Sequence, residues 1–185
     1  MPWIPSLRFH RQPSSWIRPS SAPYCMQFVQ ARACHYVTVR SVNRKAAPAP
    51  CYPHHLVNSV FRWHVRAYCA EREGFRDFNL ARIANTLNLT GSRPINADPK
   101  HDRQWHETVQ LQLAPYPNLS TEEQALLAYA SGMRKGRLSV LSRGALVPYT
   151  LHAYQVDPSI PDSDNPQRNR LVLANKSDLK SYPWC

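Results

Sequence analysis

The segment from residue 61 to residue 68 alternates strictly between two kinds of side chain. Its apolar positions are Phe61, Trp63, Val65 and Ala67, and its polar positions are Arg62, His64, Arg66 and Tyr68. Because successive side chains on a strand point to opposite faces, the pattern predicts a β-strand with one apolar face and one cationic face. No carboxylate lies on the cationic face. Guanidinium, imidazole and phenol groups gathered in this way are the chemistry of an anion receptor, and they favour phosphate.

A second strand is predicted to return beside the first. Glu71–Gly74 is a polar turn that ends in glycine, and residues 75–83 follow it with a strand-like pattern. Arg76 and Arg82 on this second segment are predicted to extend the same cationic patch.

Two interpretations of these side chains remain open. In the functional interpretation, the guanidinium groups of Arg66 and Arg82 donate paired hydrogen bonds to phosphate oxygens, and Tyr68 or Phe78 stacks on a base. In the structural one, the arginines pair with neighbouring carboxylates on a solvated face, and the available carboxylates are Glu71, Glu73 and Asp77.

The charge of the chain is placed unevenly. The formal net charge is +11, yet no Asp or Glu precedes Glu71, while nine Arg or Lys residues do. A basic half of this kind favours an anionic partner such as nucleic acid, a nucleotide or an anionic surface. No apolar run reaches the roughly 20 residues that span a bilayer. Five cysteines without a CxxC pair or a secretory signal indicate reduced thiols and a cytoplasmic protein.

The order of predicted elements indicates an α+β protein with two domains. Residues 1–29 are rich in Pro, Ser and Arg and are predicted to be disordered or non-homologous. Residues 30–90 hold several short strands and one hairpin, which favour a small barrel. A linker over 91–104 is predicted to lead to a second domain over 105–185.

The second domain is predicted to alternate strands with helices. Residues 108–113 alternate as a strand, and Ser120–Glu123 forms a capping box that opens a helix. Further strands are predicted over 137–141 and 171–173, with a helical pattern over 144–156 that a proline interrupts. This order favours a small α/β sandwich.

The sequence gives no support to an enzymatic or metal-dependent function. The eight histidines include no HExxH motif, and paired cysteines or carboxylates with metal-ligand spacing are absent from the sequence. It also lacks a GxxxxGK[ST] phosphate loop and a GxSxG elbow. We therefore expect a non-catalytic protein without metal or cofactor.

Four segments of the first domain resemble the WYL-domain transcriptional regulators, in particular the type associated with phage-defence loci. They are Val37–Ser41, Tyr52–Val57, Arg62–Cys69 and Phe75–Ile83, with Trp63-His64-Val65 in place of the name-giving Trp-Tyr-Leu. The stretch from Trp105 to Asn175 resembles the C-terminal extension domain of these regulators.

The resemblance implies an Sm-like or SH3-like barrel followed by a ferredoxin-like extension that helps the chain to form a homodimer. It also implies a pocket for a nucleotide or nucleic-acid ligand, and Ser41 and His54 match family pocket positions. With the residues above, the predicted ligand-binding set is Ser41, His54, Arg62, His64, Arg66, Tyr68, Arg76, Phe78 and Arg82.

Members of this family carry an N-terminal winged helix-turn-helix that reads the operator. Residues 1–30 are too short and too rich in proline to predict one. Val39, the Asn58–Val60 turn without glycine and Pro148 also depart from the family pattern. The prediction is a ligand-sensing module that controls DNA binding through a partner chain. The alternatives are a nonspecific Sm-like binder of RNA or single-stranded DNA and a truncated, non-functional remnant.

Overall fold

The computed structural model describes residues 34–41, 44–45, 49–59, 62–88, 92–159, 170–179 and 182. They form two compact units, of which the first ends at Asp102 and the second begins at Arg103. Each unit contains one antiparallel sheet, and helices lie mainly in the second. The predicted mixture of helices and strands is confirmed. The N-terminal segment 1–29 lies outside the described residues.

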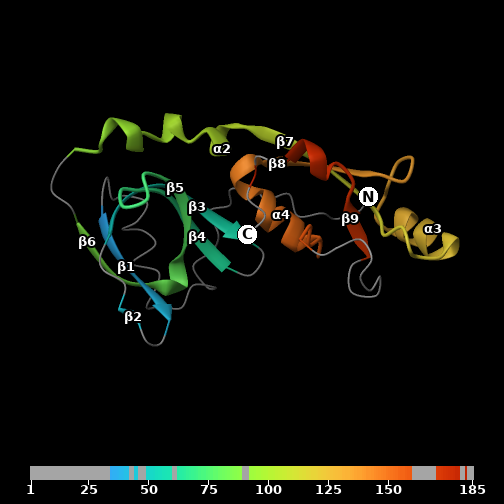
Figure 1. The fold of residues 1–185 in the computed structure, drawn as a ribbon, viewed down its shortest axis with the longest axis horizontal. Helices are drawn as coiled ribbons and strands as arrows, with labels where there is room; N and C mark the ends of the chain where they lie inside the picture. Colours follow the sequence, from blue (N-terminus) through green and yellow to red (C-terminus); the bar gives the residue numbers. More distant parts are fainter. Residues whose placement is uncertain are drawn as a thin grey trace, which may run out of the picture. The chain divides into compact units, whose positions relative to one another are not determined.

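The first unit is built on a six-stranded antiparallel sheet (Figure 1). Its strands are β1 (Cys34–Ser41), β2 (Arg44–Lys45), β3 (Ala49–Ser59), β4 (Arg62–Cys69), β5 (Gly74–Asn79) and β6 (Ile83–Asn88). The main order across the sheet is β6-β1-β3-β4-β5, and the short β2 also pairs with β1. The predicted hairpin over residues 61–83 is therefore confirmed as β4 and β5.

This sheet has to curl because its two outer strands are consecutive in the chain. Only the 3-10 turn η1 (Leu80–Arg82) joins β5 to β6. In a flat sheet, four strand spacings would separate them by roughly 19 Å, whereas three residues of 3-10 helix rise by only about 6 Å. Among the described strands no ladder joins β5 to β6. The sheet is therefore curled, but the described strands do not close it, and these strand pairings do not by themselves establish the predicted Sm-like barrel.

Residues 92–102 continue the first unit, and we call them the connector. They contain two short turns, η2 (Ile95–Ala97) and η3 (Pro99–His101). The Asp98 side chain accepts a hydrogen bond from the Lys100 amide at the start of η3. Ala97 is fully buried. Most of the stretch predicted as a linker thus belongs to the first compact unit.

The second unit has a three-stranded antiparallel sheet of order β8-β7-β9. Its strands are β7 (Thr108–Pro115), β8 (Leu138–Arg143) and β9 (Leu171–Leu173). The helices and turns are α2 (Arg103–His106), α3 (Thr121–Ala130), η4 (Gly144–Leu146), α4 (Val147–Ala153) and η5 (Lys176–Leu179). These elements do not by themselves establish the predicted ferredoxin-like arrangement. None of the described helices is long and apolar enough to cross a membrane.

The core of the second unit lies between one face of this sheet and α4. Leu111 and Leu113 of β7 are fully buried, and they cluster with Val147 and Leu151 of α4. Pro148 stands in the first turn of α4, where its missing N–H is not needed for an intrahelical hydrogen bond. The proline expected to interrupt the helix therefore helps to begin it.

Helix α3 forms as predicted, although it buries no residue. The Ser120 side chain accepts from the Glu123 amide at 3.2 Å, and the Glu123 carboxylate accepts from the Ser120 amide at 3.1 Å. This capping box opens the helix. The helix is nevertheless apolar from residue 125 to residue 130. Leu126 and Tyr129 remain 66% and 88% exposed.

Candidate anion-binding site

The central strand of the site is β4, and both of its faces are buried along most of its length. Val65 and Ala67 point into one face, where they are 1% and 0% exposed. Arg66 belongs to the opposite face and is only 4% exposed. A guanidinium group removed from water in this way is tolerated only when anions or hydrogen-bond acceptors surround it.

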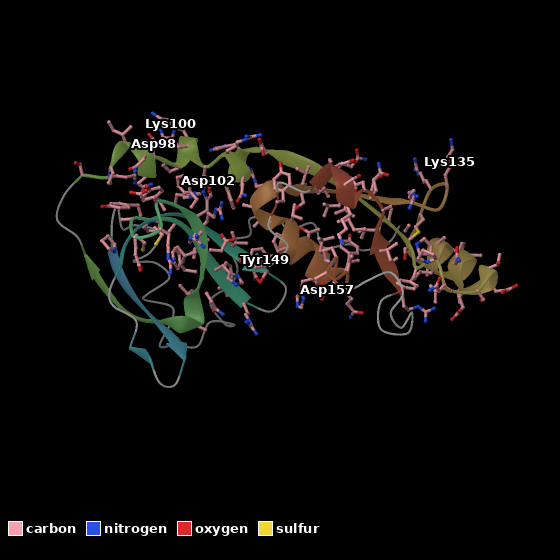
Figure 2. The ribbon with its side chains drawn as sticks, in the orientation of Figure 1. Asp98, Lys100, Asp102, Lys135, Tyr149 and Asp157 are labelled. Atoms are coloured by element: carbon pink, nitrogen blue, oxygen red, sulfur yellow. The ribbon has the colours of Figure 1, made fainter. Side chains whose placement is uncertain are left out.

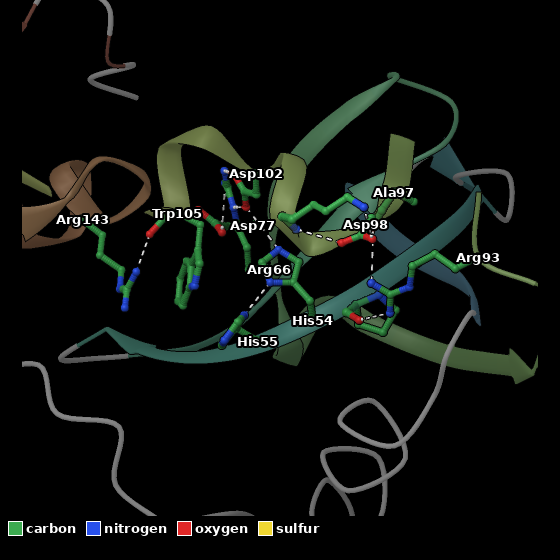
Figure 3. A network of polar contacts seen from close by, with 12 residues as sticks. His54, His55, Arg66, Asp77, Arg93, Ala97, Asp98, Asp102, Trp105 and Arg143 are labelled. Carbon is green, nitrogen blue, oxygen red and sulfur yellow. Dashed lines mark hydrogen bonds and ion pairs between the residues drawn. The ribbon is translucent and has the colours of Figure 1, made fainter. Parts of the chain in front are cut away.

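The principal partner of Arg66 is Asp102, the last residue of the connector (Figure 3). Arg66 Nε donates to Asp102 Oδ2 at 2.7 Å, and Arg66 Nη2 donates to Asp102 Oδ1 at 2.9 Å. The two bonds are parallel, as in a bidentate arginine–carboxylate pair. Asp102 is itself 2% exposed. A sheet residue and a connector residue therefore neutralise each other inside the first unit.

His54 supplies a third donor to the same carboxylate because β3 contains a β-bulge. The register changes between Pro53, which pairs with Ala67, and His55, which pairs with Arg66. Two residues of β3 thus stand opposite one residue of β4, and a bulge of this kind re-aims the extra side chain. His54 Nε2 lies 3.2 Å from Asp102 Oδ2. His54 Nδ1 also contacts Nδ1 of His55.

Arg66 has a second, weaker partner on the sheet itself. Asp77 of β5 stands directly opposite Arg66 in the ladder, and Arg66 Nη1 lies 3.4 Å from its Oδ1. The structural interpretation, in which arginines pair with nearby carboxylates, therefore holds for Arg66 and Asp77. The pairing is not on a solvated face, however, since Arg66 is buried.

The interactions within this cluster stabilise the ionised forms of Arg66 and Asp102. Burial alone would raise the pKa of Asp102, but the hydrogen bonds from Arg66 and His54 and the charge of Arg66 outweigh burial, so this pKa lies far below its ordinary value. Burial alone would lower the pKa of Arg66, but Asp102 and Asp77 together raise it. Arg66 and Asp102 consequently both stay ionised at neutral pH.

His64 and Arg62 occupy the same face of β4, nearer its start. Arg62 is exposed, whereas His64 is buried and has Nδ1 3.3 Å from the Ser59 hydroxyl. Burial, followed by repulsion from Arg62, lowers the pKa of His64 below its ordinary value of 6.5. His64 is therefore a neutral hydrogen-bonding group at neutral pH, and Arg62 is the cation that this face presents to solvent.

At the other end of β4 the same face carries a row of aromatic rings. Tyr52, Tyr68 and Phe75 stand opposite one another on β3, β4 and β5. The ring centroids of Tyr68 and Phe75 are 5.3 Å apart in an edge-on arrangement. The Tyr68 hydroxyl accepts a hydrogen bond from Asn96 Nδ2 at 2.7 Å. A residue of the connector therefore also occupies the polar end of Tyr68.

The connector covers this face along much of its length. Arg93 Nη2 donates to the Pro53 carbonyl at 2.8 Å, Asn96 reaches Tyr68, and Asp102 reaches Arg66. In Figure 2 the Asp98–Lys100 ion pair lies on the outer side of the connector, and Asp102 lies on the side towards the sheet. A hollow of about 590 Å³ is lined by connector residues, namely Ile95, Asn96 and His101.

The structure separates two of the predicted site residues from the others. Phe78 pairs with Val65 and Arg76 pairs with Ala67, so both project from the face of the sheet opposite to Arg66. The expectation that Arg76 extends the cationic patch is thus not met by the strand register. The side chains of Ser41 and Arg82 lie outside the described residues, and their roles stay predictions.

The connector residues were not found by sequence reasoning. Asp102 is 36 residues from Arg66 in the chain and lies in a segment predicted as a linker. The one available signal was that β4 itself carries no acidic residue, so that Arg66, once buried, needs counter-ions from other segments. Among the described residues, no group of three or more His, Cys, Asp or Glu side chains is placed to hold a metal ion.

Comparison with protein families agrees with this two-part organisation. The WYL domain pattern matches residues 30–86, which include the whole of β4 and β5. The pattern described as "BrxR transcriptional regulator, C-terminal dimerization domain" matches residues 108–179. The chain therefore belongs to the WYL-domain transcriptional regulators and carries the C-terminal dimerization domain of the BrxR type.

Within that family, the chain is similar to the DNA-binding transcriptional repressor CapW. It is 28% identical to CapW of Stenotrophomonas maltophilia over 92% of this chain and 56% of that protein. It is 35% identical to CapW of Pseudomonas aeruginosa over 69% of this chain and 42% of that protein. The chain thus spans about half the length of these relatives. Proteasome accessory factor B/C of Arthrobacter aurescens is 14% identical, with a TM-score of 0.42, over 89% of this chain and 26% of that chain.

The buried pair leads to a prediction about stability. Arg66→Ala should lower the free energy of unfolding by about 3–5 kcal/mol, because it leaves the buried Asp102 carboxylate without its main counter-ion. Chemical denaturation measures the loss. Arg62→Ala is the matched control, since Arg62 is an exposed arginine on the same face, and we expect a change within about 0.5 kcal/mol. Equal, small changes in both variants would show that the Arg66–Asp102 pair contributes little to the fold.

His64 leads to a prediction about pH. Because its folded-state pKa lies below the ordinary 6.5, the unfolded chain binds a proton at this side chain more readily than the folded chain does. The stability gained from neutral His64 is complete above pH 6.5 and decreases as the pH falls towards the folded-state pKa. Unfolding curves between pH 7 and pH 5 should therefore show a smaller loss for His64→Gln than for the wild type. Parallel pH dependences would contradict the assignment.

Proposed function

We propose that this chain is the ligand-sensing part of a cytoplasmic WYL-type transcriptional regulator. Its ligand is a nucleotide or a nucleic-acid fragment, which binds through phosphate to the cationic face of β4 and thereby controls DNA binding. The DNA-reading domain lies outside the described residues, on the same polypeptide or on a partner chain. We further propose that the curled sheet of the first unit is an Sm-like barrel and that the second unit is a ferredoxin-like extension.

The observation that carries the proposal is the buried guanidinium of Arg66 and its bidentate carboxylate. A site in which a buried guanidinium and a histidine N–H converge on two anionic oxygens has the chemistry of a phosphate receptor. Exposed Arg62 on the same face offers a first contact for an incoming anion. The name of the CapW relatives, DNA-binding transcriptional repressor, supports the link to DNA.

A nonspecific binder of RNA or single-stranded DNA is the second candidate, and exposed arginines on both faces of the sheet favour it. Arg62 and Arg76 are both exposed and project from opposite faces of the β4–β5 pair. Binding of this kind depends on summed charge, so its affinity falls steeply as salt rises. A non-functional remnant, the third candidate, predicts no saturable binding at all.

Helix α3 supports a proposal about the oligomeric state. Residues 125–130 of α3 are apolar on all sides, and such a helical segment is normally buried, yet no residue of α3 is buried within this chain. The matched family pattern is named a dimerization domain. We propose that α3, with Leu126 and Tyr129, lies in the interface of a homodimer formed through the second unit.

The two exposed arginines provide a test of the ligand site. Arg62→Ala should weaken binding of a fluorescein-labelled pentathymidylate by about tenfold, which is the effect of losing one charge-assisted hydrogen bond of roughly 1.5 kcal/mol. Arg76→Ala is the matched control and should leave the affinity unchanged, because Arg76 projects from the other face. Fluorescence anisotropy at two salt concentrations measures both. Equal losses with a steep salt dependence would favour the nonspecific binder.

The dimer proposal is tested on α3. Tyr129→Glu should raise the dissociation constant of the dimer at least tenfold, because a carboxylate would be buried where an aromatic ring packs. Sedimentation velocity across a concentration series measures this constant. Lys135→Gln changes the net charge by the same amount at an exposed position beyond the helix and should have no effect. An unchanged dimer in Tyr129→Glu would place the interface elsewhere.

A further inference from the structure

Asp102 differs from the other anionic partner of Arg66 in where it comes from. Asp77 belongs to β5 and is held opposite Arg66 by the ladder of the sheet. Asp102 belongs to the connector, which reaches the sheet through the side chains of Arg93, Asn96 and Asp102. If the connector moves away, Asp77 stays beside Arg66 and Asp102 leaves.

The carboxylate of Asp102 also presents two anionic oxygens to Arg66, as the phosphate group of a ligand would. Its two oxygens accept from Nε and Nη2 of Arg66, and one of them also lies 3.2 Å from Nε2 of His54. Two non-bridging oxygens of a phosphate match a guanidinium fork in the same way. The donors that would recognise a phosphate are therefore occupied by an anion of the protein itself (Figure 3).

We propose that Asp102 is an internal substitute for the phosphate group of the ligand, and that ligand binding exchanges one anion for the other and releases the connector from the sheet. This inference rests on the proposed function, because it assumes that a phosphate-bearing ligand binds to this face. In the exchange Arg66 always keeps two anionic partners, Asp77 and either Asp102 or the phosphate. Asp102 becomes solvated when it is displaced.

Replacement of Asp102 by the phosphate of a small ligand would change the conformation of the connector. The connector ends at Asp102, and the dimerization domain pattern begins at residue 108. A ligand that only filled an empty pocket would leave this segment unchanged. A ligand that displaces Asp102 changes the segment through which the chain continues to that domain. The ligand class is correspondingly narrow: it needs a phosphate with two free oxygens, as in a mononucleotide or a short oligonucleotide.

Competition from Asp102 must lower the apparent affinity of the ligand. Only the fraction of molecules with the connector released is competent to bind, so the apparent dissociation constant is raised in inverse proportion to that fraction. Asp102→Asn keeps the size of the side chain but removes its charge, and it should increase the competent fraction. We expect this variant to bind the labelled pentathymidylate roughly tenfold more tightly than the wild type.

Asp98→Asn is the matched control for this experiment. It removes the same charge from the same connector, but Asp98 is paired with Lys100 on the outer side. It should leave the affinity unchanged. An equal gain in both variants would show that only the net charge matters, and it would overturn the exchange.

A second measurement uses the unaltered chain and does not depend on whether Asp102→Asn folds. Hydrogen–deuterium exchange of the connector amides, such as those of Ala97 and His101, should become faster when the pentathymidylate is added. Unchanged or slower exchange at saturating probe would overturn the release of the connector. In that case binding itself would still support the proposed function.

The outcomes of the two proposals are therefore distinguishable. Saturable binding with neither a gain in Asp102→Asn nor faster connector exchange rejects the anion substitute and keeps the ligand-sensing function. Absence of saturable binding in the wild type and in Asp102→Asn rejects the function, and the anion substitute with it.

Discussion

The first unit depends on one physical constraint, which is that a guanidinium group has been placed inside the protein. A buried charge without a partner would cost far more than a small domain can tolerate. Arg66 is accordingly surrounded by Asp77 from the neighbouring strand and Asp102 from the connector. Asp102 thereby fixes the connector to the sheet. The polar face of β4, which would be exposed to water in a simple amphipathic strand, is buried at Arg66.

The second unit is stabilised in a different way. Its core cluster around Leu111 and Leu113 is apolar, and the buried polar residues Ser142 and Thr150 are neutral and hydrogen-bond to each other. In this unit, residues 125–130 of α3 are apolar, yet no residue of α3 is buried, and Leu126 and Tyr129 are exposed. Among the described residues, the buried ion pairs therefore lie in the first unit, which includes the WYL domain, and the exposed apolar side chains Leu126, Tyr129 and Leu141 lie in the dimerization domain.

Sequence reasoning succeeded where local rules decide the structure. The alternation from residue 62 to residue 69 predicted β4 and its cationic face, and Ser120 and Glu123 predicted the start of α3. It did not succeed where the structure depends on a residue distant in the sequence or on the register between two strands. Asp102 meets Arg66 only through tertiary folding, and the pairing of Phe78 with Val65 depends on where the turn sets the ladder. A closed barrel could not be inferred from strand count, because closure requires a ladder between β5 and β6 that the alternation does not encode.

The bulge in β3 has an evolutionary consequence. Pro53 pairs with Ala67 and His55 pairs with Arg66, so His54 is a supernumerary residue between two intact stretches of ladder. Deleting its single codon would join those stretches into a regular strand without inverting any other side chain, in contrast to deletions elsewhere in a strand. The histidine donor can therefore be gained or lost independently of the sheet that carries it. A one-residue deletion at the bulge would therefore remove one hydrogen-bond donor to Asp102 while the pairing of β3 with β4 is kept on both sides.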